Sequence, residues 1–435
     1  MTISKNTRTV AIWGLGREGL AALAWMRERY PSCAVTILND TPLSEAPDNV
    51  PALIGDDAAQ ALRSGRFEVV IKSPGVSLYR PEIAAARAKG TRFTSGVNLW
   101  FRDNPSASTI AVTGTKGKST TVRLLHHMLK QAGMDVALIG NVGVAALGQR
   151  PGRDLTVLEL SSYQIADLYA APNIALVTNL YIDHTPWHGG VEQYHLDKLR
   201  LIANPTTIAV LNANSDRLVE KVGDRTNSIW YGRADAYHAL GGQLLHGEHL
   251  VETSTFPLRG AHNLENLAAA CTVCDLVGVT GVRQRVDLSG FAQLRHRLEE
   301  FRGRDGRLCV NDSISTVPEA TLMALGAYAS QKVALFLGGN DRGQDHDTLL
   351  DHLAKARNID CVVLLPDTGA RIAQEMSAAT FNFPVHKAAS LAEGVELAFA
   401  TASQSTVFLL SPAAPSFGHF RDFEERGDRF IDLCV

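Results

Sequence analysis

The feature that most constrains this chain is a short apolar, β-branched segment that leads into a glycine turn, and it occurs three times. Residues 9–13 lead into Gly14, residues 109–112 into Gly114, and residues 333–337 into Gly338. Each reads as a strand, then a loop, then a helix. Further apolar segments of this kind alternate with helical patterns, at 69–71, 156–158, 175–177, 208–211, 361–365 and 407–410. The pattern predicts an α/β protein with mostly parallel sheets.

The length of 435 residues predicts several domains. Polar breaks lie near 102–106 and 288–290, and we predict domains at residues 1–104, 105–292 and 293–435. The 42 Lys and Arg residues nearly balance the 45 Asp and Glu residues, so there is no general positive field for nucleic acid or an anionic membrane. No apolar run reaches the length of a membrane span.

The six cysteines are scattered, and the amino terminus shows no signal pattern. This favours reduced thiols and a cytoplasmic location. Cys271 and Cys274 invite a zinc-site interpretation, but they fall inside a continuous helical pattern over 266–277 and no second pair exists. We therefore expect two buried small residues one helical turn apart.

The most specific loop is residues 113–120, Thr-Gly-Thr-Lys-Gly-Lys-Ser-Thr. It follows a strand, precedes a helical stretch, and matches G-x-x-x-x-G-K-[ST] except that Val112 occupies the first glycine position. Backbone N–H groups of such a loop bind phosphates, the lysine reaches the β- and γ-phosphates, and the hydroxyl holds Mg²⁺. The alternative is a glycine-rich turn with a solvated lysine.

A second glycine loop, residues 14–19, has the pattern G-x-G-x-x-G, and Asp40 ends the next strand. This arrangement is typical of a diphosphate site, although a purely structural tight turn has the same pattern. Two phosphate loops favour ATP beside a diphosphate substrate. A nicotinamide oxidoreductase would use the first loop but leaves Lys118 and Glu159 without a function.

Candidate metal ligands follow two strands of the middle region. Glu159 ends one strand, and Asp183 and His184 follow another, where ligands of open α/β sheets gather. Glu159 and His184 are candidates to share a divalent cation with ATP phosphates, and the alternative for each is a hydrogen-bonded loop residue. Lys198 lies in a helical run over 191–201, where a lone lysine is usually a solvated surface charge.

Three polar loops follow strands in the last third of the chain, at 311–316, 338–343 and 411–417. The carboxyl ends of parallel strands meet at one edge, so these loops predict a ligand-binding rim. Ordinary connecting loops are the alternative.

Taken in order, these motifs resemble the Mur ligase family, and in particular its glutamate-adding members. The resemblance covers essentially the whole chain. It rests on residues 73–75, 114–119, 140–143, 158–164, 183–184, 198, 262–266, 296–297, 311–313, and 410–413 through 424–427.

The resemblance implies three α/β domains: a Rossmann-like UDP-binding domain, a central P-loop ATPase domain and a C-terminal Rossmann-like domain that brings the amino acid. It implies a cytoplasmic, monomeric, ATP-dependent acid–amino-acid ligase of peptidoglycan precursor synthesis. This enzyme adds glutamate to UDP-N-acetylmuramoyl-L-alanine through an acyl phosphate. A folylpolyglutamate-type ligase shares the ATP loop but has no reason for a UDP domain, and a non-catalytic nucleotide-binding protein needs no Glu159, His184 and Lys198 together.

The resemblance also implies roles for individual residues. The catalytic residues would be Lys118, His184, Lys198 and Asp312. ATP would contact Gly114, Thr115, Lys116, Gly117, Lys118, Ser119, Thr120, Asn266, Arg297 and Asp312. The UDP substrate would contact Gly16, Arg17, Asp40, Thr41, Ser73, Gly75, Asn141, Ser161 and Gln164. Two Mg²⁺ ions would be bound by Ser119, Glu159, His184 and a carbamoylated Lys198, because a carbamate turns a cation into an oxygen ligand.

The chain departs from the family where glutamate should bind. D-glutamate ligases usually carry a lysine where this chain has Ile314, and losing one charge-assisted hydrogen bond costs about 1.5–3 kcal/mol. Arg342 is the obvious remaining cation. The other acceptor-site candidates are Thr316, Ser416, Phe417 and Phe420. A remodelled carboxylate site favours the branch that adds L-glutamate, with the D-glutamate-adding ligase as the alternative.

Overall fold

The computed structural model describes residues 3–43, 47, 49–142, 144–182, 185–253, 255–291, 295–377 and 381–435. The chain forms two compact units. The first comprises Met1–Phe256 and Asn263–Ser289, and the second comprises Pro257–His262 and Gly290–Val435. The predicted boundary at 292/293 falls outside the described residues, and the one at 104/105 stays a prediction.

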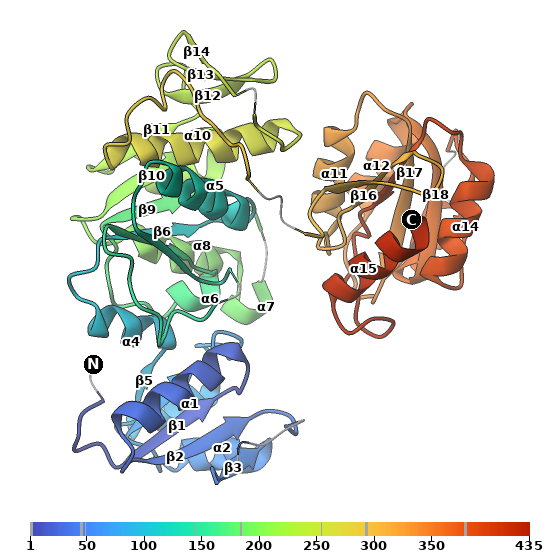
Figure 1. The fold of residues 1–435 in the computed structure, drawn as a ribbon. Helices are drawn as coiled ribbons and strands as arrows, with labels where there is room; N and C mark the ends of the chain where they lie inside the picture. Colours follow the sequence, from blue (N-terminus) through green and yellow to red (C-terminus); the bar gives the residue numbers. More distant parts are fainter. Residues whose placement is uncertain are drawn as a thin grey trace. The chain divides into compact units, whose positions relative to one another are not determined.

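The amino-terminal part of the first unit is a parallel sheet with the order β3-β2-β1-β4-β5, drawn in blue in Figure 1. Alternate residues of the central strand β1 enter two separate cores, Val10 and Ile12 one, Ala11 and Trp13 the other. The sheet is therefore covered on both faces, as the Rossmann-like expectation requires. Its strands are β1 (Thr9–Trp13), β2 (Ala34–Asn39), β3 (Ala52–Ile54), β4 (Val69–Lys72) and β5 (Arg92–Thr94), and its helices are α1 (Arg17–Arg29), α2 (Asp56–Arg63), α3 (Pro81–Ala88) and α4 (Gly96–Asp103).

The middle part of the first unit is a second parallel sheet, with the order β11-β10-β9-β6-β8-β7. The central strand β6 is buried along its whole length, which places the phosphate loop that follows it at the middle of the sheet edge. The strands are β6 (Thr109–Thr113), β7 (Val136–Gly140), β8 (Leu155–Glu159), β9 (Ile174–Val177), β10 (Ile208–Asn212) and β11 (Ser228–Tyr231). The helices are α5 (Lys118–Gln131), α6 (Ser162–Ile165), α7 (Thr185–His188), α8 (Val191–Leu199), the 3₁₀ turn η1 (Arg200–Ile202), α9 (Asp216–Val222) and α10 (Ala261–Leu276).

A small antiparallel sheet, not predicted from the sequence, is attached to the middle part. It consists of β12 (Tyr237–Leu240), β13 (Gln243–His246) and β14 (His249–Val251). The turn between β12 and β13 is Gly241-Gly242, and both residues have positive φ, as a tight hairpin turn requires. Helix α10 carries Cys271 and Cys274, which are both fully buried, so the prediction of two buried helical cysteines is confirmed.

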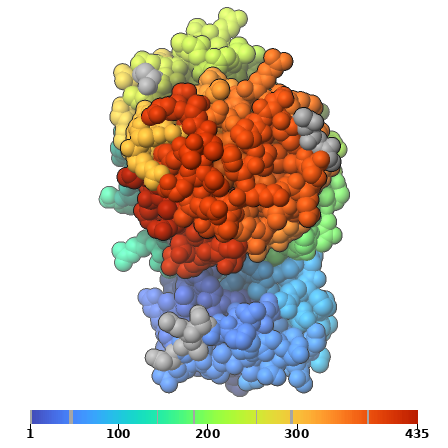
Figure 2. Space-filling model, turned by 90° about the vertical axis from the view of Figure 1, so that its right-hand side faces the viewer, coloured from blue at the N-terminus to red at the C-terminus, as the bar shows by residue number. Residues whose placement is uncertain are grey.

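The second unit is built on a mixed sheet with the order β15-β16-β20-β17-β18-β19, in which only the β15–β16 pair is antiparallel. Two cores cover its faces. Figure 2 shows one face of this unit in yellow-orange to red. The strands are β15 (Glu299–Arg302), β16 (Leu308–Asn311), β17 (Val333–Gly339), β18 (Ile359–Asp367), β19 (Val385–Lys387) and β20 (Val407–Leu410), and the helices are α11 (Pro318–Ala327), α12 (Asp347–Lys355), α13 (Thr368–Met376), α14 (Leu391–Thr401) and α15 (Phe423–Cys434).

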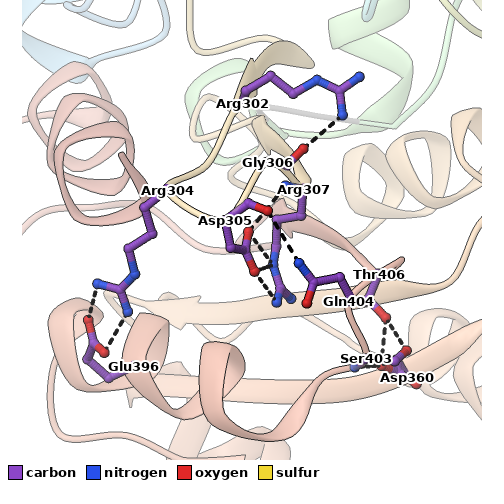
Figure 3. Close-up of polar contacts among 10 residues, drawn as sticks. All are labelled: Arg302, Arg304, Asp305, Gly306, Arg307, Asp360, Glu396, Ser403, Gln404 and Thr406. Atoms are coloured by element: carbon purple, nitrogen blue, oxygen red, sulfur yellow. Dashed lines mark hydrogen bonds and ion pairs between the residues drawn. The ribbon is translucent and has the colours of Figure 1, made fainter.

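A polar network joins the β15–β16 hairpin to the starts of β18 and β20 in this unit (Figure 3). The guanidinium of Arg307 pairs with Asp305 at 2.5 Å and lies 4.3 Å from the ring centre of Phe408. Asp360 accepts hydrogen bonds from the hydroxyls of Ser403 and Thr406, at 3.0 and 2.6 Å. The network therefore lies at the amino-terminal ends of β18 and β20, away from the polar loops that follow the carboxyl ends of the strands.

Two further properties concern the whole chain. None of the helices within the described ranges has the length and apolar character needed to cross a membrane. All five tryptophans, at positions 13, 25, 100, 187 and 230, belong to the first unit.

Candidate functional site

The phosphate loop between β6 and α5 depends on two glycines with positive φ. Gly114 has φ +143° and Gly117 has φ +84°. A side chain at Gly114 would collide with Oγ1 of Thr178, and one at Gly117 with Oδ1 of Asn266. Glycine is therefore required at both positions by conformation and by space.

The loop is held in shape by the residues that follow β9. The amides of Thr115 and Lys116 both donate to Oδ1 of Asn179, at 3.0 and 2.8 Å, and Oγ1 of Thr178 donates to the carbonyl of Lys116 at 2.6 Å. Because these partners lie on the neighbouring strand end, the loop conformation is fixed by the sheet and not by the loop alone.

Several predicted ATP residues gather around this loop. Nζ of Lys118, the first residue of α5, donates to the carbonyls of Gly114 and Thr115, both at 3.0 Å. Asn266 on α10 accepts a hydrogen bond from Thr121 at 3.2 Å and lies against Gly117. The structure thus brings Asn266 to residues 114–120, although the sequence separates them by about 150 positions.

Lys198 lies at the same loop. Its side chain is buried, and Nζ donates to the carbonyl of Gly114 at 2.9 Å while lying 4.8 Å from the ring centre of Tyr194. The hydroxyl of Tyr194 in turn lies 2.9 Å from Oγ1 of Thr115. The interpretation of Lys198 as a solvated surface charge is therefore wrong, and its position at the phosphate loop agrees with the location that the resemblance implied.

Glu159, at the end of β8, is a buried carboxylate with one oxygen unused. Oε1 accepts a hydrogen bond from Nδ2 of Asn141 at 2.9 Å. Oε2 is buried and has no hydrogen-bond partner among the described residues. Such an oxygen fits a cation ligand, because a buried carboxylate without a partner is costly. The other candidate ligands on this edge, Asp183 and His184, lie outside the described residues, and within the described ranges no three His, Cys, Asp or Glu residues form a metal cluster.

The glycine loop after β1 is held by a contact from the end of β4. Gly14 has φ +87°, and its carbonyl accepts a hydrogen bond from Oγ of Ser73 at 2.6 Å. Asp40 pairs with Arg80 at 2.7 Å, and Arg80 lies over the ring of Trp13 at 4.6 Å. The remaining candidates of this loop region are exposed: Gly16, Arg17, Thr41 and Gly75.

Helix α6 connects this region to the middle sheet. Ser161 and Gln164 form a reciprocal capping box at its amino end. Nε2 of Gln164 donates to Oε1 of Glu18 on α1 at 3.1 Å, and burial raises the pKa of Glu18. Ser161 and Gln164 therefore lie beside the start of α1.

A chain of hydrogen bonds that the sequence did not indicate begins at Ser162, the first residue of α6. His188 contacts Oδ2 of Asp197 through Nδ1 at 2.6 Å and Oγ of Ser162 through Nε2 at 3.0 Å. The hydroxyl of Tyr79 donates to both oxygens of Asp197 at 2.7 Å. Ser162, His188 and Asp197 are each at most 2% exposed. This Ser–His–Asp geometry is enclosed by protein and connects the loop after β4 to α8.

In the second unit, Asp312 follows β16 and is buried. Oδ2 accepts hydrogen bonds from the hydroxyls of Ser315 and Ser411, at 2.5 and 2.8 Å, and Oδ1 accepts one from the amide of Leu298 at 3.2 Å. Burial raises the pKa of Asp312 to about 6, and the hydroxyl donors and the charge of Arg297 oppose this shift. Arg297 and Asp312, both predicted to contact ATP, therefore interact electrostatically.

The predicted acceptor residues lie on the carboxyl edge of this sheet. The side chain of Gln344 bridges the amide of Arg342 and the carbonyl of Thr316, at 3.2 and 3.3 Å, and the guanidinium of Arg342 lies 5.5 Å from the ring centre of Phe417. Ser416 and Phe420 line a cavity at the ends of β17 and β18. The sequence missed three basic residues that line the same cavity, two arginines and a histidine: Arg426, Arg429 and His419.

Three family models match successive parts of the chain. The N-terminal domain of MurD-like Mur ligases matches residues 8–95, the Mur ligase middle domain residues 112–274, and the glutamate ligase domain of Mur ligases residues 296–414.

Full-length relatives agree with these matches. The chain is 38% identical to the UDP-N-acetylmuramoyl-L-alanine–L-glutamate ligase of Xanthomonas euvesicatoria pv. vesicatoria, covering 98% of this chain and 95% of the relative. It is 39% identical to the ligase of the same name from Xylella fastidiosa, covering 98% and 94%. Among solved structures, MurF from Acinetobacter baumannii has the same fold, with a TM-score of 0.62 at 19% identity, covering 100% of this chain and 92% of that chain.

Proposed function

The chain belongs to the Mur ligase family, and we propose that it joins L-glutamate to UDP-N-acetylmuramoyl-L-alanine in an ATP-dependent reaction. It is a glutamate-adding ligase of peptidoglycan precursor synthesis. The observation that carries the choice of L-glutamate is the identity of 38–39% over nearly the whole chain to ligases named for that acceptor. This chain has Ile314 where D-glutamate ligases usually carry a lysine, and this difference supports the same choice.

The first half of the proposed reaction activates the alanyl carboxylate. A carboxylate is a poor electrophile, and transfer of the γ-phosphoryl group of ATP to it gives an acyl phosphate with a good leaving group. The amides at the start of α5 and Nζ of Lys118 would orient the phosphates and offset their charge. Mg²⁺ would supply further charge neutralisation, and Oε2 of Glu159 and the hydroxyl of Ser119 suit it, with His184 and a carbamoylated Lys198 as additional proposed ligands.

In the second half, the amine of glutamate attacks the acyl phosphate, and a tetrahedral intermediate collapses to an amide and phosphate. The amine must lose a proton to react. We propose that Asp312 or His184 accepts it, directly or through water. With a pKa of about 6, Asp312 is mostly ionised at neutral pH and can act as a base. Turnover and a pH profile unchanged in Asp312→Asn would remove Asp312 from this role.

The decisive experiment measures phosphate release with ATP, Mg²⁺ and UDP-N-acetylmuramoyl-L-alanine, with D-glutamate and L-glutamate in parallel reactions. The expected result is turnover with the L form, confirmed by the mass of the product. Turnover with only the D form would assign the chain to the D-glutamate-adding ligases, and silence with both would overturn the proposed reaction.

We further propose that the enzyme works as a cytoplasmic monomer, which light scattering of the purified protein tests. A folylpolyglutamate-type activity is less well supported, because residues 8–95 match a MurD-like N-terminal domain. A nicotinamide oxidoreductase is not supported either, because the glycine loop after β1 lies within residues 8–95, which match the MurD-like N-terminal domain.

A further inference from the structure

The turn after β4, residues 73–76, is held through its carbonyl oxygens. Nζ of the buried Lys72 donates to the carbonyls of Ser73 and Val76, at 3.3 and 3.0 Å. The hydroxyl of Ser73 in turn donates to the carbonyl of Gly14 in the glycine loop after β1, at 2.6 Å. Carbonyl oxygens repel an anion, and a loop that binds phosphate presents N–H groups to it instead. Carbonyl oxygens that are bound by the protein itself therefore suit a turn that receives a diphosphate.

Trp187, on the short helix α7, binds the same turn from the middle part of the first unit. Its indole Nε1 donates to the carbonyl of Gly75 at 3.1 Å. In the opposite direction, the hydroxyl of Ser77 donates to the backbone carbonyl of Trp187 at 2.6 Å. This reciprocal pair of hydrogen bonds fixes the turn against α7.

The indole ring of Trp187 is itself held in place. It stacks on the ring of Tyr163 from α6, with the ring centres 4.4 Å apart and the ring planes at 17°. Nζ of Lys72 lies 5.5 Å from the centre of the indole, within the range of a cation–π contact. Because the orientation of the ring is fixed, the direction of its N–H group toward Gly75 is fixed as well.

Open space for a ligand lies beside the turn. Gly75 and Gly16, both assigned to the UDP substrate by the sequence analysis, are exposed. A side chain added at either glycine would meet no described atom within 4 Å. A ligand therefore has room on this side of the two loops, while the carbonyl of Gly75 is bound by Trp187.

We propose that Trp187 is a positioning residue for the UDP substrate, because its hydrogen bond to the carbonyl of Gly75 keeps the turn after β4 in the shape that receives the diphosphate. The proposal rests on the proposed function. It makes the UDP site of the amino-terminal sheet depend on α7, a helix of the middle part of the first unit. The contact acts on the turn and not on the reacting atoms, so it should affect binding of the UDP substrate and not turnover at saturation.

The test is the calorimetric titration of UDP into wild type and Trp187→Phe, with saturating ADP present so that UDP does not occupy the ATP loop. Phenylalanine keeps an aromatic ring beside Tyr163 and removes the N–H donor. The expected result is a dissociation constant for UDP raised about three- to tenfold, because a hydrogen bond that shapes the site is lost. In steady-state kinetics, the KM for UDP-N-acetylmuramoyl-L-alanine should rise by a similar factor, while kcat and the KM for ATP stay within about twofold.

Trp100→Phe is the matched control. The indole Nε1 of Trp100 also donates to a backbone carbonyl, that of Gln149, at 2.9 Å, and the side chain is 1% exposed. The same substitution therefore removes the same kind of contact elsewhere in the first unit. Trp100→Phe should destabilise the fold and yet leave the dissociation constant for UDP within about twofold of that of wild type.

Two further measurements guard against misfolding of Trp187→Phe. Ser77→Ala removes the reciprocal hydrogen bond and leaves the indole in place, and it should raise the dissociation constant for UDP at least about twofold. In ¹⁵N-labelled wild type, UDP should shift the indole N–H resonance of Trp187 and leave that of Trp100 unshifted, with the resonances assigned from the two Trp→Phe variants.

The outcomes separate this proposal from the proposed function. Wild type that binds UDP but releases no phosphate with either form of glutamate defeats the proposed function, and the affinities for UDP still decide the role of Trp187. Wild type that does not bind UDP overturns the proposal, because the turn then receives no diphosphate. Unchanged affinity for UDP in Trp187→Phe, or an equal loss in Trp100→Phe, overturns it as well. Where Trp187→Phe does not fold, Ser77→Ala decides in the same way.

Discussion

At the scale of single residues, the buried charges of this chain fall into two kinds. Lys72 and Asp167 form a buried pair 3.5 Å apart, where each offsets the other. Glu159 and Arg426 are different, because no ion pair engages either of them among the described residues, and each keeps one buried atom without a hydrogen-bond partner there. A charge of the first kind is explained by the fold, whereas one of the second kind indicates a ligand.

Glu159→Gln keeps the shape of the side chain and removes its charge. We expect turnover to fall by at least about 100-fold, because a neutral amide is a poor ligand for Mg²⁺. The melting temperature should stay equal or rise, because an uncompensated buried charge is removed. Phosphate release across a range of Mg²⁺ concentrations measures the first effect and calorimetry the second. Glu192→Gln, which breaks only an exposed pair with Lys221, is the control, and turnover similar to wild type in Glu159→Gln would contradict the metal role.

The free energy of unfolding of the second unit should depend on pH through the titration of Asp312. Its pKa is raised to about 6, so between about pH 4 and 6 the folded state keeps a proton that the unfolded state has lost. Stability is therefore greatest below this window and falls as the pH rises through it, by up to about 3 kcal/mol. Asp312→Asn should remove this loss.

Calorimetry of wild type and Asp312→Asn from pH 4 to 7 measures the difference. Asp341→Asn is a suitable control, because Arg371 lowers the pKa of Asp341 to about 2, below the tested range. Parallel pH dependence of wild type and Asp312→Asn would show that Asp312 is not buried as described.

At the scale of elements, helix α8 has two functions at once. Nζ of Lys198 on this helix donates a hydrogen bond to the carbonyl of Gly114 in the phosphate loop. The preceding residue, Asp197, accepts a hydrogen bond from the hydroxyl of Tyr79 in the loop after β4. One helix therefore connects the ATP loop to the segment that follows Ser73 and Gly75, the proposed contacts of the UDP substrate.

Tyr79→Phe removes both hydrogen bonds to the buried Asp197. Burial and the Asp197 carboxylate raise the pKa of Tyr79, so the hydroxyl is a donor at all relevant pH values. We expect the free energy of unfolding of the first unit to fall by about 1–3 kcal/mol. Tyr169→Phe, at a tyrosine that is 59% exposed, should cost little. Urea unfolding of both variants decides the matter, and equal stabilities would mean that the Tyr79 contact contributes nothing.

The elements that the sequence predicted are those whose signal is local. The strand, the glycine and the following helix at Gly14, Gly114 and Gly338 lie within a few residues of one another. The hairpin at Gly241-Gly242 had a comparable signal and was not predicted. Ser313 and Arg426 are different, because they are 113 positions apart and their contact arises only when α15 packs beside the end of β16. The helical pattern alone could not show that Arg426 is buried.

At the scale of the whole molecule, the proposed ATP residues are divided between the two units. Asn266 and residues 114–120 belong to the first unit, and Arg297 and Asp312 to the second. Each unit has its own apolar cores, so each can unfold with its own transition. Family resemblance, and not local pattern, predicted that both units contribute to one nucleotide site.

ATP with Mg²⁺ should raise the melting temperature of the first unit. Ligand at 100 times its dissociation constant stabilises the binding state by about 2.7 kcal/mol. Lys118→Ala should lose most of this gain, whereas Lys130→Ala, at the exposed end of the same helix, should keep it. Scanning calorimetry resolves the transitions, and a simultaneous shift of the second transition would support the proposed contacts of Arg297 and Asp312. No shift in wild type would contradict ATP binding at this loop.

The placement of every tryptophan in the first unit has an optical consequence. Tryptophan fluorescence therefore reports on the first unit only, and the second unit gives no tryptophan signal. A single tryptophan introduced at an exposed position of the second unit, such as Phe417, would add a separate signal whose quenching by acrylamide or energy transfer to a coloured nucleotide follows that half alone. Native tryptophan fluorescence thus follows the first unit, and one introduced tryptophan is enough to follow the second.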